Sequence, residues 1–210
     1  MDKVINFYNT NKAYGCFSNF YFSPFQCKGF TWRTSEHYFQ AMKFEGTEYF
    51  EELSKIEKPM DVARSGRDRN KPLRSDWESI KDEVMFEALK LKFDSNEDLR
   101  KILLSTGDAI LVEHTSNDSY WGDGGDGSGK NKLGILLMRL RAQYPEYDGE
   151  FYLPQWIQYP DNPPFDMFWR MGTGETHTYH MYMWSQKWGE LAEKEYERYF
   201  EPPIEWASIL

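Results

Sequence analysis

Three polar side chains of different chemistry are spaced to share one face of a single helix. Glu36, Gln40 and Lys43 stand at positions i, i+4 and i+7 of the stretch 31–44, and side chains at this spacing project from the same side of an α-helix. They bring a carboxylate, an amide and an ammonium together beside aromatic neighbours. This combination favours the wall of a binding pocket. The alternative interpretation is an amphipathic surface helix that carries an ordinary Glu–Lys pair.

The element that must position these side chains is a helix predicted to begin at Ser35. Thr34 or Ser35 can accept a hydrogen bond from one of the first free amides. Glu36 then lies in the first turn, where the helix dipole favours a negative charge. Residues 30–32 have the pattern of a short strand. The sequence therefore predicts that Glu36 lies just after a strand-to-helix turn.

A cluster of cations follows at residues 64–74. Its guanidinium groups suit bidentate recognition of a phosphate, although a solvated basic loop is the alternative. Trp77 comes next, in the first turn of a helix predicted over 77–93 with a Ser75–Glu78 capping box. Trp77 is either a core residue or a plate for a flat ring, since stacking on a base contributes roughly 1–3 kcal/mol. The cation cluster at residues 64–74 consists of Arg64, Arg67, Arg69, Lys71 and Arg74.

A glycine-rich loop at 122–134 leads into an apolar helix. The run 124–130 matches a phosphate-binding P-loop, but Asn131 stands where that motif needs a Ser or Thr for magnesium. The acids of the loop also lack EF-hand spacing, so both motifs are excluded. What remains is a set of glycine amides that can approach an anion, with Asp118 and Trp121 placed to hold sugar hydroxyls and a ring. The alternative is a flexible surface loop.

Apolar periodicity outlines the other elements of the first 145 residues. Alternating or continuous apolar runs predict strands at 4–8 and 109–113. Helical spacing predicts helices at 47–56, 59–64, 77–93 and 96–107, and another from Leu133 onward. We therefore expect an α+β fold that is mostly helical, with a small sheet containing the early strands and the strand at 109–113.

The composition limits the class of protein. The net charge of −9 argues against a protein that coats nucleic acid or anionic membrane by charge alone. Cys16 and Cys27 lack metal-site spacing and favour a reducing compartment. No apolar run approaches membrane-spanning length, and the N-terminus lacks an apolar signal core. We expect a soluble cytoplasmic protein with no membrane association.

The composition changes near Pro145. Residues 1–145 carry 22 acids and 21 bases, whereas residues 146–210 carry 12 acids and 4 bases together with five of the eight tryptophans. We predict a domain at 1–145 and an acidic, aromatic-rich C-terminal extension at 146–210. So many aromatic side chains imply burial, either against the domain or against a protein partner.

Within the extension, residues 151–156 have the pattern of an irregular wrap with a short strand. Alternating apolar residues at 167–171 and 177–184 predict a hairpin joined by residues 172–174. Residues 185–200 have the pattern of a charged amphipathic helix. His177 and His180 are candidate metal ligands, but no cysteine lies near them, so we interpret them as ordinary hydrogen-bond partners and predict no metal.

A long ordered series of short motifs runs through residues 5–143. In this series the chain resembles the YbiA/NADAR family of N-glycosidases, and the resemblance favours the pocket interpretation of Glu36. The extension lies outside it. The motifs are Asn6-Phe7-Tyr8, Tyr14-Gly15-x-Phe17-Ser18-Asn19-Phe20, Trp32-x-Thr34-Ser35-Glu36-His37-Tyr38-Phe39-Gln40-Ala41-x-Lys43-Phe44, Gly66-Arg67, Trp77-x-x-x-Lys81-x-x-Val84-Met85, Leu111-Val112-Glu113, Asp118-x-x-Trp121-Gly122 and Gly127-x-Gly129-x-Asn131-x-Leu133-Gly134-x-Leu136-Leu137-Met138.

The resemblance implies a YbiA-like fold and hydrolysis of a ribosyl C–N bond. Members of the family act on phosphoribosylamino-pyrimidine intermediates of riboflavin synthesis, and related members remove ADP-ribose from guanine in nucleic acid. The expected substrate is thus a ribosylated small molecule or ADP-ribosylated guanine, with no metal or cofactor. Glu36 is implied as the catalytic carboxylate, with Asp118 beside it. The substrate-lining residues implied are Asn19, Lys43, Arg67, Trp77, Trp121, Gly122 and Asn131.

The chemistry suits these residue types. Breaking a ribosyl C–N bond builds positive charge on the anomeric carbon and the ring oxygen, and a nearby carboxylate stabilises that charge and can orient water. Two non-enzymatic alternatives stay open. One is a module that binds ADP-ribose or a nucleotide without hydrolysing it. The other is a core that serves mainly as an interaction platform, with the extension carrying the biological role.

Overall fold

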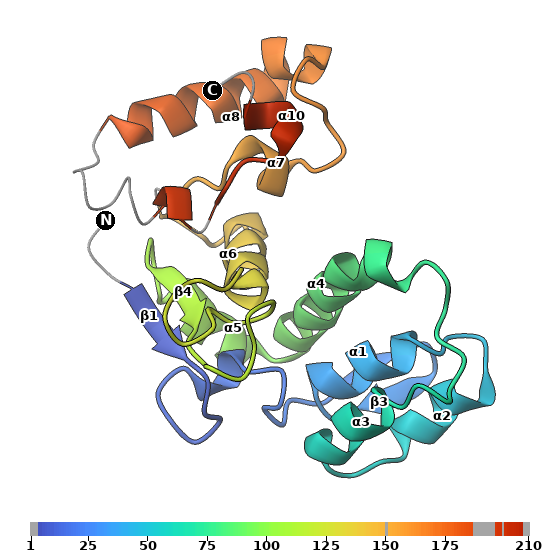
Figure 1. Ribbon diagram of the computed structural model, residues 1–210. Helices are drawn as coiled ribbons and strands as arrows, with labels where there is room; N and C mark the ends of the chain where they lie inside the picture. Colours follow the sequence, from blue (N-terminus) through green and yellow to red (C-terminus); the bar gives the residue numbers. More distant parts are fainter. Residues whose placement is uncertain (1–3, 150, 187–195, 199, 208–210) are drawn as a thin grey trace.

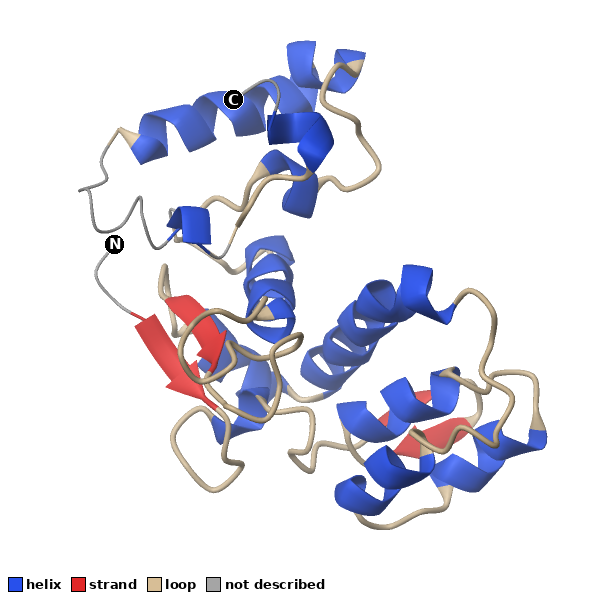
Figure 2. Cartoon of the chain, viewed as in Figure 1, coloured by secondary structure: helices blue, strands red, loops and turns tan. Residues whose placement is uncertain are grey.

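The computed structural model describes residues 4–149, 151–186, 196–198 and 200–207 (Figure 1). Helices make up 48% of the structure, and the strands are short (Figure 2). In chain order the elements are β1 (Val4–Phe7), η1 (Gly15–Phe17), β2 (Phe25–Cys27), β3 (Phe30–Trp32), α1 (Ser35–Met42), α2 (Glu48–Ser54), α3 (Pro59–Ser65), α4 (Trp77–Ser95), α5 (Glu97–Leu104), β4 (Ile110–Glu113), α6 (Lys132–Gln143), α7 (Gln155–Gln158), η2 (Met167–Arg170), α8 (Gly172–Ser185) and α10 (Ile204–Ala207).

The strands form two separate pairs. β1 and β4 run parallel, with Val4 opposite Ile110 and Phe7 opposite Glu113. β2 and β3 form an antiparallel hairpin. Its turn residues Lys28 and Gly29 have φ angles of 51° and 81°, which suits a two-residue turn of the kind that matches strand twist. The expected strands are confirmed, but those at 4–7 and 30–32 belong to different sheets.

The helices build one core between the two strand pairs. α1 packs on α2, α3 and α4, and α4 in turn packs on α6, which covers β4 (Figure 1). All eight residues of α1 are buried, so the interpretation of this stretch as an amphipathic surface helix is wrong. The α+β fold, mostly helical with small sheets, is confirmed.

The start of α4 differs from the prediction. Asp76 is the N-cap residue, and its side chain makes no capping bond to the helix, so the predicted Ser75–Glu78 capping box is wrong. The Asp76 carboxylate instead accepts hydrogen bonds of 2.7 and 3.0 Å from the Arg74 guanidinium. Arg74 therefore binds the Asp76 carboxylate, which would otherwise be available to cap the helix.

The C-terminal extension is helical where a hairpin was predicted. α8 spans residues 172–185, and α7 occupies the region where a short strand was expected. The aromatic residues of α8 alternate in sequence, but their contacts follow helical spacing. His177 and Trp184 lie seven residues apart, and both rings contact Tyr152, at 6.0 and 5.7 Å between centroids. The predicted helix at 185–200 falls largely on residues 187–195, which lie outside the described chain.

The extension packs against the domain beside α6 (Figure 1). Phe151, Trp184, Tyr196 and Phe200 belong to the same cluster of buried apolar side chains as the strands and helices of residues 4–144. The Arg141 guanidinium of α6 lies 5.3 Å from the centre of the Phe151 ring. Every helix in the described chain is too short or too polar to cross a lipid bilayer.

Candidate active site

Glu36 lies in the first turn of α1, as predicted, and backbone contacts fix its position. The Glu36 amide donates a hydrogen bond of 3.1 Å to the carbonyl oxygen of Asn19. Thr34 is the N-cap residue, and its hydroxyl oxygen accepts from the His37 amide at 3.3 Å. The His37 ring donates through Nε2 to the carbonyl of Ile56. The start of α1 is therefore tied to two loops, and Glu36 is held between them.

The Glu36 carboxylate is buried, and among the described residues it has one side-chain donor. Only 5% of Glu36 is exposed, and its Oε1 accepts a hydrogen bond of 2.8 Å from Gln40 Nε2. Burial raises the pKa of Glu36, while the Gln40 hydrogen bond and the charges of Lys43 and Arg67 oppose that rise. The spacing that placed Gln40 on the face of Glu36 and Lys43 thus indicated a real contact.

Three residues in contact with Glu36 or next to it carry unpaired polar atoms. Asn19 Oδ1, Ser35 Oγ and Gln40 Oε1 are buried, and none has a hydrogen-bond partner within the described chain. Asn19 and Gln40 also form hydrogen bonds with Glu36 through other atoms. Buried polar groups in folded proteins are nearly always paired. These three residues therefore indicate a place that a polar ligand completes. Asn19, predicted to line the substrate, is one of them.

A cationic cavity of about 690 Å³ opens beside α1. Lys43 lines it, and the Lys43 ammonium donates to the carbonyl of Gly66 at 3.1 Å, while burial lowers the pKa of Lys43. Arg67 is exposed at the mouth, and no hydrogen bond or ion pair among the described residues uses its guanidinium. The cavity is lined by Lys43, Phe44, Gly66, Arg67, Asp68, Arg69, Lys71, Leu73, Trp77 and Glu78.

Phe39 joins two tryptophans into one aromatic wall. Its ring centre lies 5.0 Å from that of Trp77 and 5.3 Å from that of Trp121. The Lys43 ammonium lies 5.6 Å from the Trp77 ring centre. Trp77 is only 5% exposed, so it is a core residue that also lines the cavity, whereas Trp121 is half-buried. The wall brings together residues 44 positions apart in the sequence.

Asp118 organises the loop in which it lies. Its Oδ1 accepts hydrogen bonds of 2.8 Å from the amides of Tyr120 and Trp121, and its carbonyl accepts from the Gly124 amide at 3.1 Å. Gly122 has no room for a Cβ, which would press on the carbonyls of Glu113 and Asp118. This dense bonding argues against a flexible surface loop, and it leaves Asp118 Oδ2 as the atom that can face a substrate.

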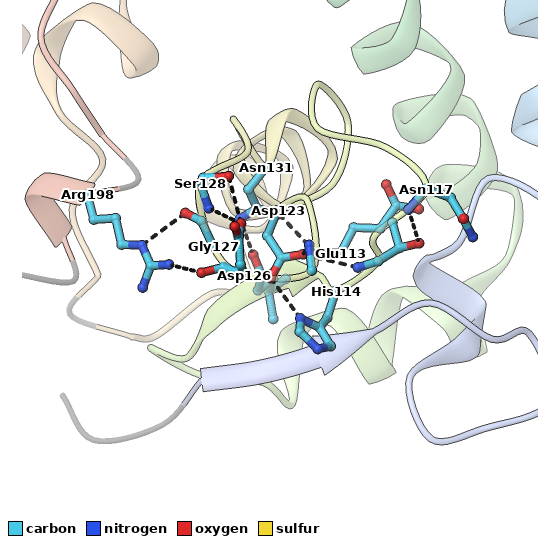
Figure 3. A network of polar contacts seen from close by, with 12 residues as sticks. Glu113, His114, Asn117, Asp123, Asp126, Gly127, Ser128, Asn131 and Arg198 are labelled. Carbon is cyan, nitrogen blue, oxygen red and sulfur yellow. Dashed lines mark hydrogen bonds and ion pairs between the residues drawn. The ribbon is translucent and has the colours of Figure 1, made fainter.

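Asn131 serves strand β4 rather than the cavity. It is fully buried with a φ of 46°, its Nδ2 donates to the carbonyl of Leu111 at 2.9 Å, and its Oδ1 accepts from the Glu113 amide at 3.0 Å (Figure 3). Both ends of the amide are therefore paired with the strand. The structure gives Asn131 a positioning contact where substrate contact was predicted.

Glu113 is a third acid at this site, and the sequence-based list of site residues missed it. It ends β4 with 8% exposure, and no hydrogen bond or ion pair in the described part of the chain uses its carboxylate. Burial and the charges of Asp118, Glu36 and Asp123 raise the pKa of Glu113 to about 8. The available signal was an acid that directly follows a run of buried apolar strand residues.

The described residues contain no group of side chains that could form a metal centre. Among those residues, no three His, Cys, Asp or Glu side chains are grouped so that they could hold an ion. His177, considered above as a ligand, uses Nε2 to donate to the carbonyl of Leu153 at 2.9 Å. It therefore joins α8 to the segment that precedes α7.

Gly66 controls the donor to Glu36, and Gly66→Ala is expected to lower kcat about tenfold, the effect of losing one hydrogen bond to a charged group. A Cβ at Gly66 would overlap Gln40 Oε1, which would push the amide away from Glu36. Steady-state kinetics measures the loss. Gln40→Ala should cost as much, because it removes the same donor from Glu36. A folded Gln40→Ala protein with unchanged kcat would contradict this contact.

Trp77→Ala is expected to raise KM about tenfold, since stacking on an aromatic ring contributes roughly 1–3 kcal/mol. It should also lower Tm, because Trp77 is nearly buried. Trp77→Phe keeps a ring in the wall and should retain most of the affinity. KM values and thermal unfolding of both variants measure these effects. A folded Trp77→Ala protein with unchanged KM would remove Trp77 from the substrate site.

Comparison with known proteins places the chain among N-glycosidases. The NADAR domain model matches residues 6–144. N-glycosidase YbiA of Escherichia coli is 58% identical over 142 residues, which cover 68% of this chain and 89% of the relative. Riboflavin biosynthesis protein VVA0006 of Vibrio vulnificus is 37% identical over 183 residues, covering 84% of this chain and 50% of the relative. The NMR structure of E. coli YbiA matches with a TM-score of 0.64 at 57% identity, over 68% of this chain and 85% of that one.

Proposed function

The chain belongs to the NADAR family and is an N-glycosidase, and on this basis we propose that it hydrolyses the ribosyl C–N bond of phosphoribosylamino-pyrimidine intermediates of riboflavin synthesis. The single observation that carries the proposal is the buried Glu36 carboxylate, on which the charges of Lys43 and Arg67 act from the lining of the cavity. Such a cavity suits a substrate with a phosphate, a ribose and a flat base.

Each part of that substrate has a counterpart in the cavity, which Lys43, Arg67 and Trp77 line, or directly next to it. Lys43 and Arg67 supply positive charge for the phosphate. The wall of Phe39, Trp77 and Trp121 suits the pyrimidine ring. The riboflavin biosynthesis name of the Vibrio relative supports the same substrate class. We assign the ribose to the space between these groups, next to Glu36 and Asp118.

The two buried glutamates suit different steps of the hydrolysis. Burial raises the pKa of both glutamates. At Glu36 an amide donor and two cations oppose that rise, whereas the charges acting on Glu113 are all negative and add to it. We therefore assign the base to Glu36 and the acid to Glu113. In the proposed reaction the C1′–N bond breaks with its electron pair passing to nitrogen, which takes a proton from Glu113. Water adds to C1′ and gives its proton to Glu36, which also stabilises the developing positive charge.

A second candidate substrate is ADP-ribose linked to guanine in DNA or nucleotides. The observation in its favour is the exposed cationic rim, where Arg67 and Arg69 face the cavity mouth. A local basic rim of this kind can hold one extruded base of a nucleic acid even though the whole chain is acidic. The leaving nitrogen and the charge on the ribose would be handled by the same acids.

Product analysis by mass spectrometry separates these substrates. Purified protein is incubated separately with a phosphoribosylamino-pyrimidine and with DNA that carries ADP-ribosylated guanine. Release of ribose 5-phosphate from the first is the expected result. Release of ADP-ribose from the second alone would replace the metabolite with the nucleic-acid adduct. Binding of either compound without release would indicate a module that holds its ligand without hydrolysing it.

A further inference from the structure

The C-terminal extension touches the glycine-rich loop through one arginine. Arg198 Nε donates a hydrogen bond of 3.0 Å to the carbonyl of Gly127, and its Nη2 donates one of 3.0 Å to the carbonyl of Asp126 (Figure 3). One planar guanidinium therefore holds two successive backbone carbonyls, a geometry that suits arginine and not lysine. The two partners lie 71 and 72 residues away in the sequence.

The loop is shaped to receive this side chain. Gly127 is buried with a φ of 82°, and a Cβ added there would overlap the Arg198 guanidinium. The backbone conformation and the space thus both require glycine at this position. Asp126 also caps the same turn, because its Oδ1 accepts from the amide of Ser128 at 2.9 Å.

The aromatic core of the extension anchors Arg198. Tyr196 and Phe200 are 5% and 2% exposed, and their ring centres lie 6.3 and 6.1 Å from that of Phe151. The Tyr196 hydroxyl donates to the carbonyl of Tyr152 at 2.8 Å. Arg198 therefore projects from a segment that is fixed to the body of the protein.

The loop in turn holds the acids of the candidate active site. The Gly129 amide donates to the carbonyl of Asp123 at 2.8 Å, and the Asp123 amide donates to the carbonyl of Glu113 at 3.0 Å. On the other side, the Gly124 amide donates to the carbonyl of Asp118. A displacement of residues 126–127 would therefore be passed through these hydrogen bonds of the loop to both Glu113 and Asp118.

We propose that Arg198 is a positioning residue through which the C-terminal extension braces the glycine-rich loop and thereby sets the placement of Glu113 and Asp118. This inference rests on the proposed function, because it concerns the same acids. The NADAR match ends at residue 144, so the brace is an addition that the extension makes to the family's domain. The activity of this chain then depends on how the extension packs against the glycine-rich loop.

Amide hydrogen exchange in the full-length protein tests the brace without any substrate. Arg198→Ala is expected to speed exchange at Asp123, Gly124 and Gly129 about tenfold, the effect of a local opening made easier by the loss of backbone contacts. Arg170→Ala is the matched control, because it removes the same charge from the same extension at an exposed position. Unchanged exchange in Arg198→Ala, or equal acceleration in Arg170→Ala, would overturn the proposal.

Kinetics tests whether the brace reaches the active site. Arg198→Ala should lower kcat/KM about tenfold with little change in Tm, because exposed polar contacts contribute little to stability. Arg198→Lys should recover part of the activity, since a lysine can reach only one carbonyl at a time. Faster amide exchange in the loop of Arg198→Ala together with an unchanged kcat/KM would also overturn the proposal. If no tested substrate is cleaved by the wild type, the proposed function fails, and the exchange results at Asp123, Gly124 and Gly129 then decide the brace alone.

Discussion

Glu36→Gln is expected to lower turnover at least about 1,000-fold, the scale seen when a group that stabilises transition-state charge is removed from a buried site. The amide has the shape of the carboxylate but carries no charge to stabilise the positive anomeric carbon. Its Oε1 can still accept from Gln40 Nε2, so the start of α1 should keep its geometry. Single-turnover rates and substrate binding by calorimetry measure the two effects separately.

Glu87→Gln is the control for Glu36→Gln. Glu87 lies on α4 outside the cavity, and its carboxylate accepts from the Tyr38 hydroxyl at 2.7 Å, a bond that a Gln carbonyl oxygen can also accept. Turnover should stay near that of the wild type. A Glu36→Gln protein that folds and keeps more than about a tenth of its turnover would exclude Glu36 as the charge-stabilising group, since this corresponds to less than about 1.4 kcal/mol.

Glu113→Gln is expected to lower kcat about 100-fold or more, because general acid catalysis contributes typically about 10²–10⁴-fold. The wild-type rate should fall as the pH rises through about 8, where Glu113 loses its proton. The residual rate of the variant should show no such decline. A pH–rate profile of both proteins measures the difference. An alkaline decline that persists in the variant would assign the acid to another group.

Although Glu113→Gln should lower kcat, it should raise the stability of the folded protein at alkaline pH. In the unfolded chain Glu113 titrates near 4.5, the ordinary value for a glutamate, whereas in the folded protein burial and three negative charges raise its pKa to about 8. The stability linked to the raised pKa is fully present below pH 4.5, the pKa of Glu113 in the unfolded chain. It is lost as the pH rises through about 8, the pKa of Glu113 in the folded protein. Gln mimics the protonated acid at every pH. Glu113→Gln should therefore have a higher Tm than the wild type at pH 9 and a similar one at pH 4, by thermal unfolding.

Local patterns predicted the elements that hold Glu36. A Thr–Ser pair before an acid, followed by regular helical spacing, placed Glu36 in the first turn of α1. The buried run at 109–113 predicted β4 for a similar reason. These signals are short-range, because each depends on residues within one or two turns of the chain.

Long-range packing decided what the patterns missed. Burial and the charges of Asp118, Glu36 and Asp123 raise the pKa of Glu113. The apolar run before Glu113 signals an acid at the end of a buried strand, but it does not reveal these three charges, which come from other parts of the chain. The residues of α8 alternate like a strand, yet the rings of Tyr152 and Tyr159 select helical spacing. Arg198 could not be assigned to the loop from sequence, since 71 residues separate it from Gly127.

The central claim of the mechanism is that Glu36 and Glu113 divide the roles of base and acid. Carbon-13 NMR titration of glutamate carboxyl groups tests this division most directly, with the Glu113 resonance identified by its absence from Glu113→Gln. We predict that this resonance titrates at about 8, so that Glu113 still carries its proton at neutral pH. A Glu113 resonance that titrates near 4.5, the ordinary value for a glutamate, would contradict the assignment of Glu113 as the acid.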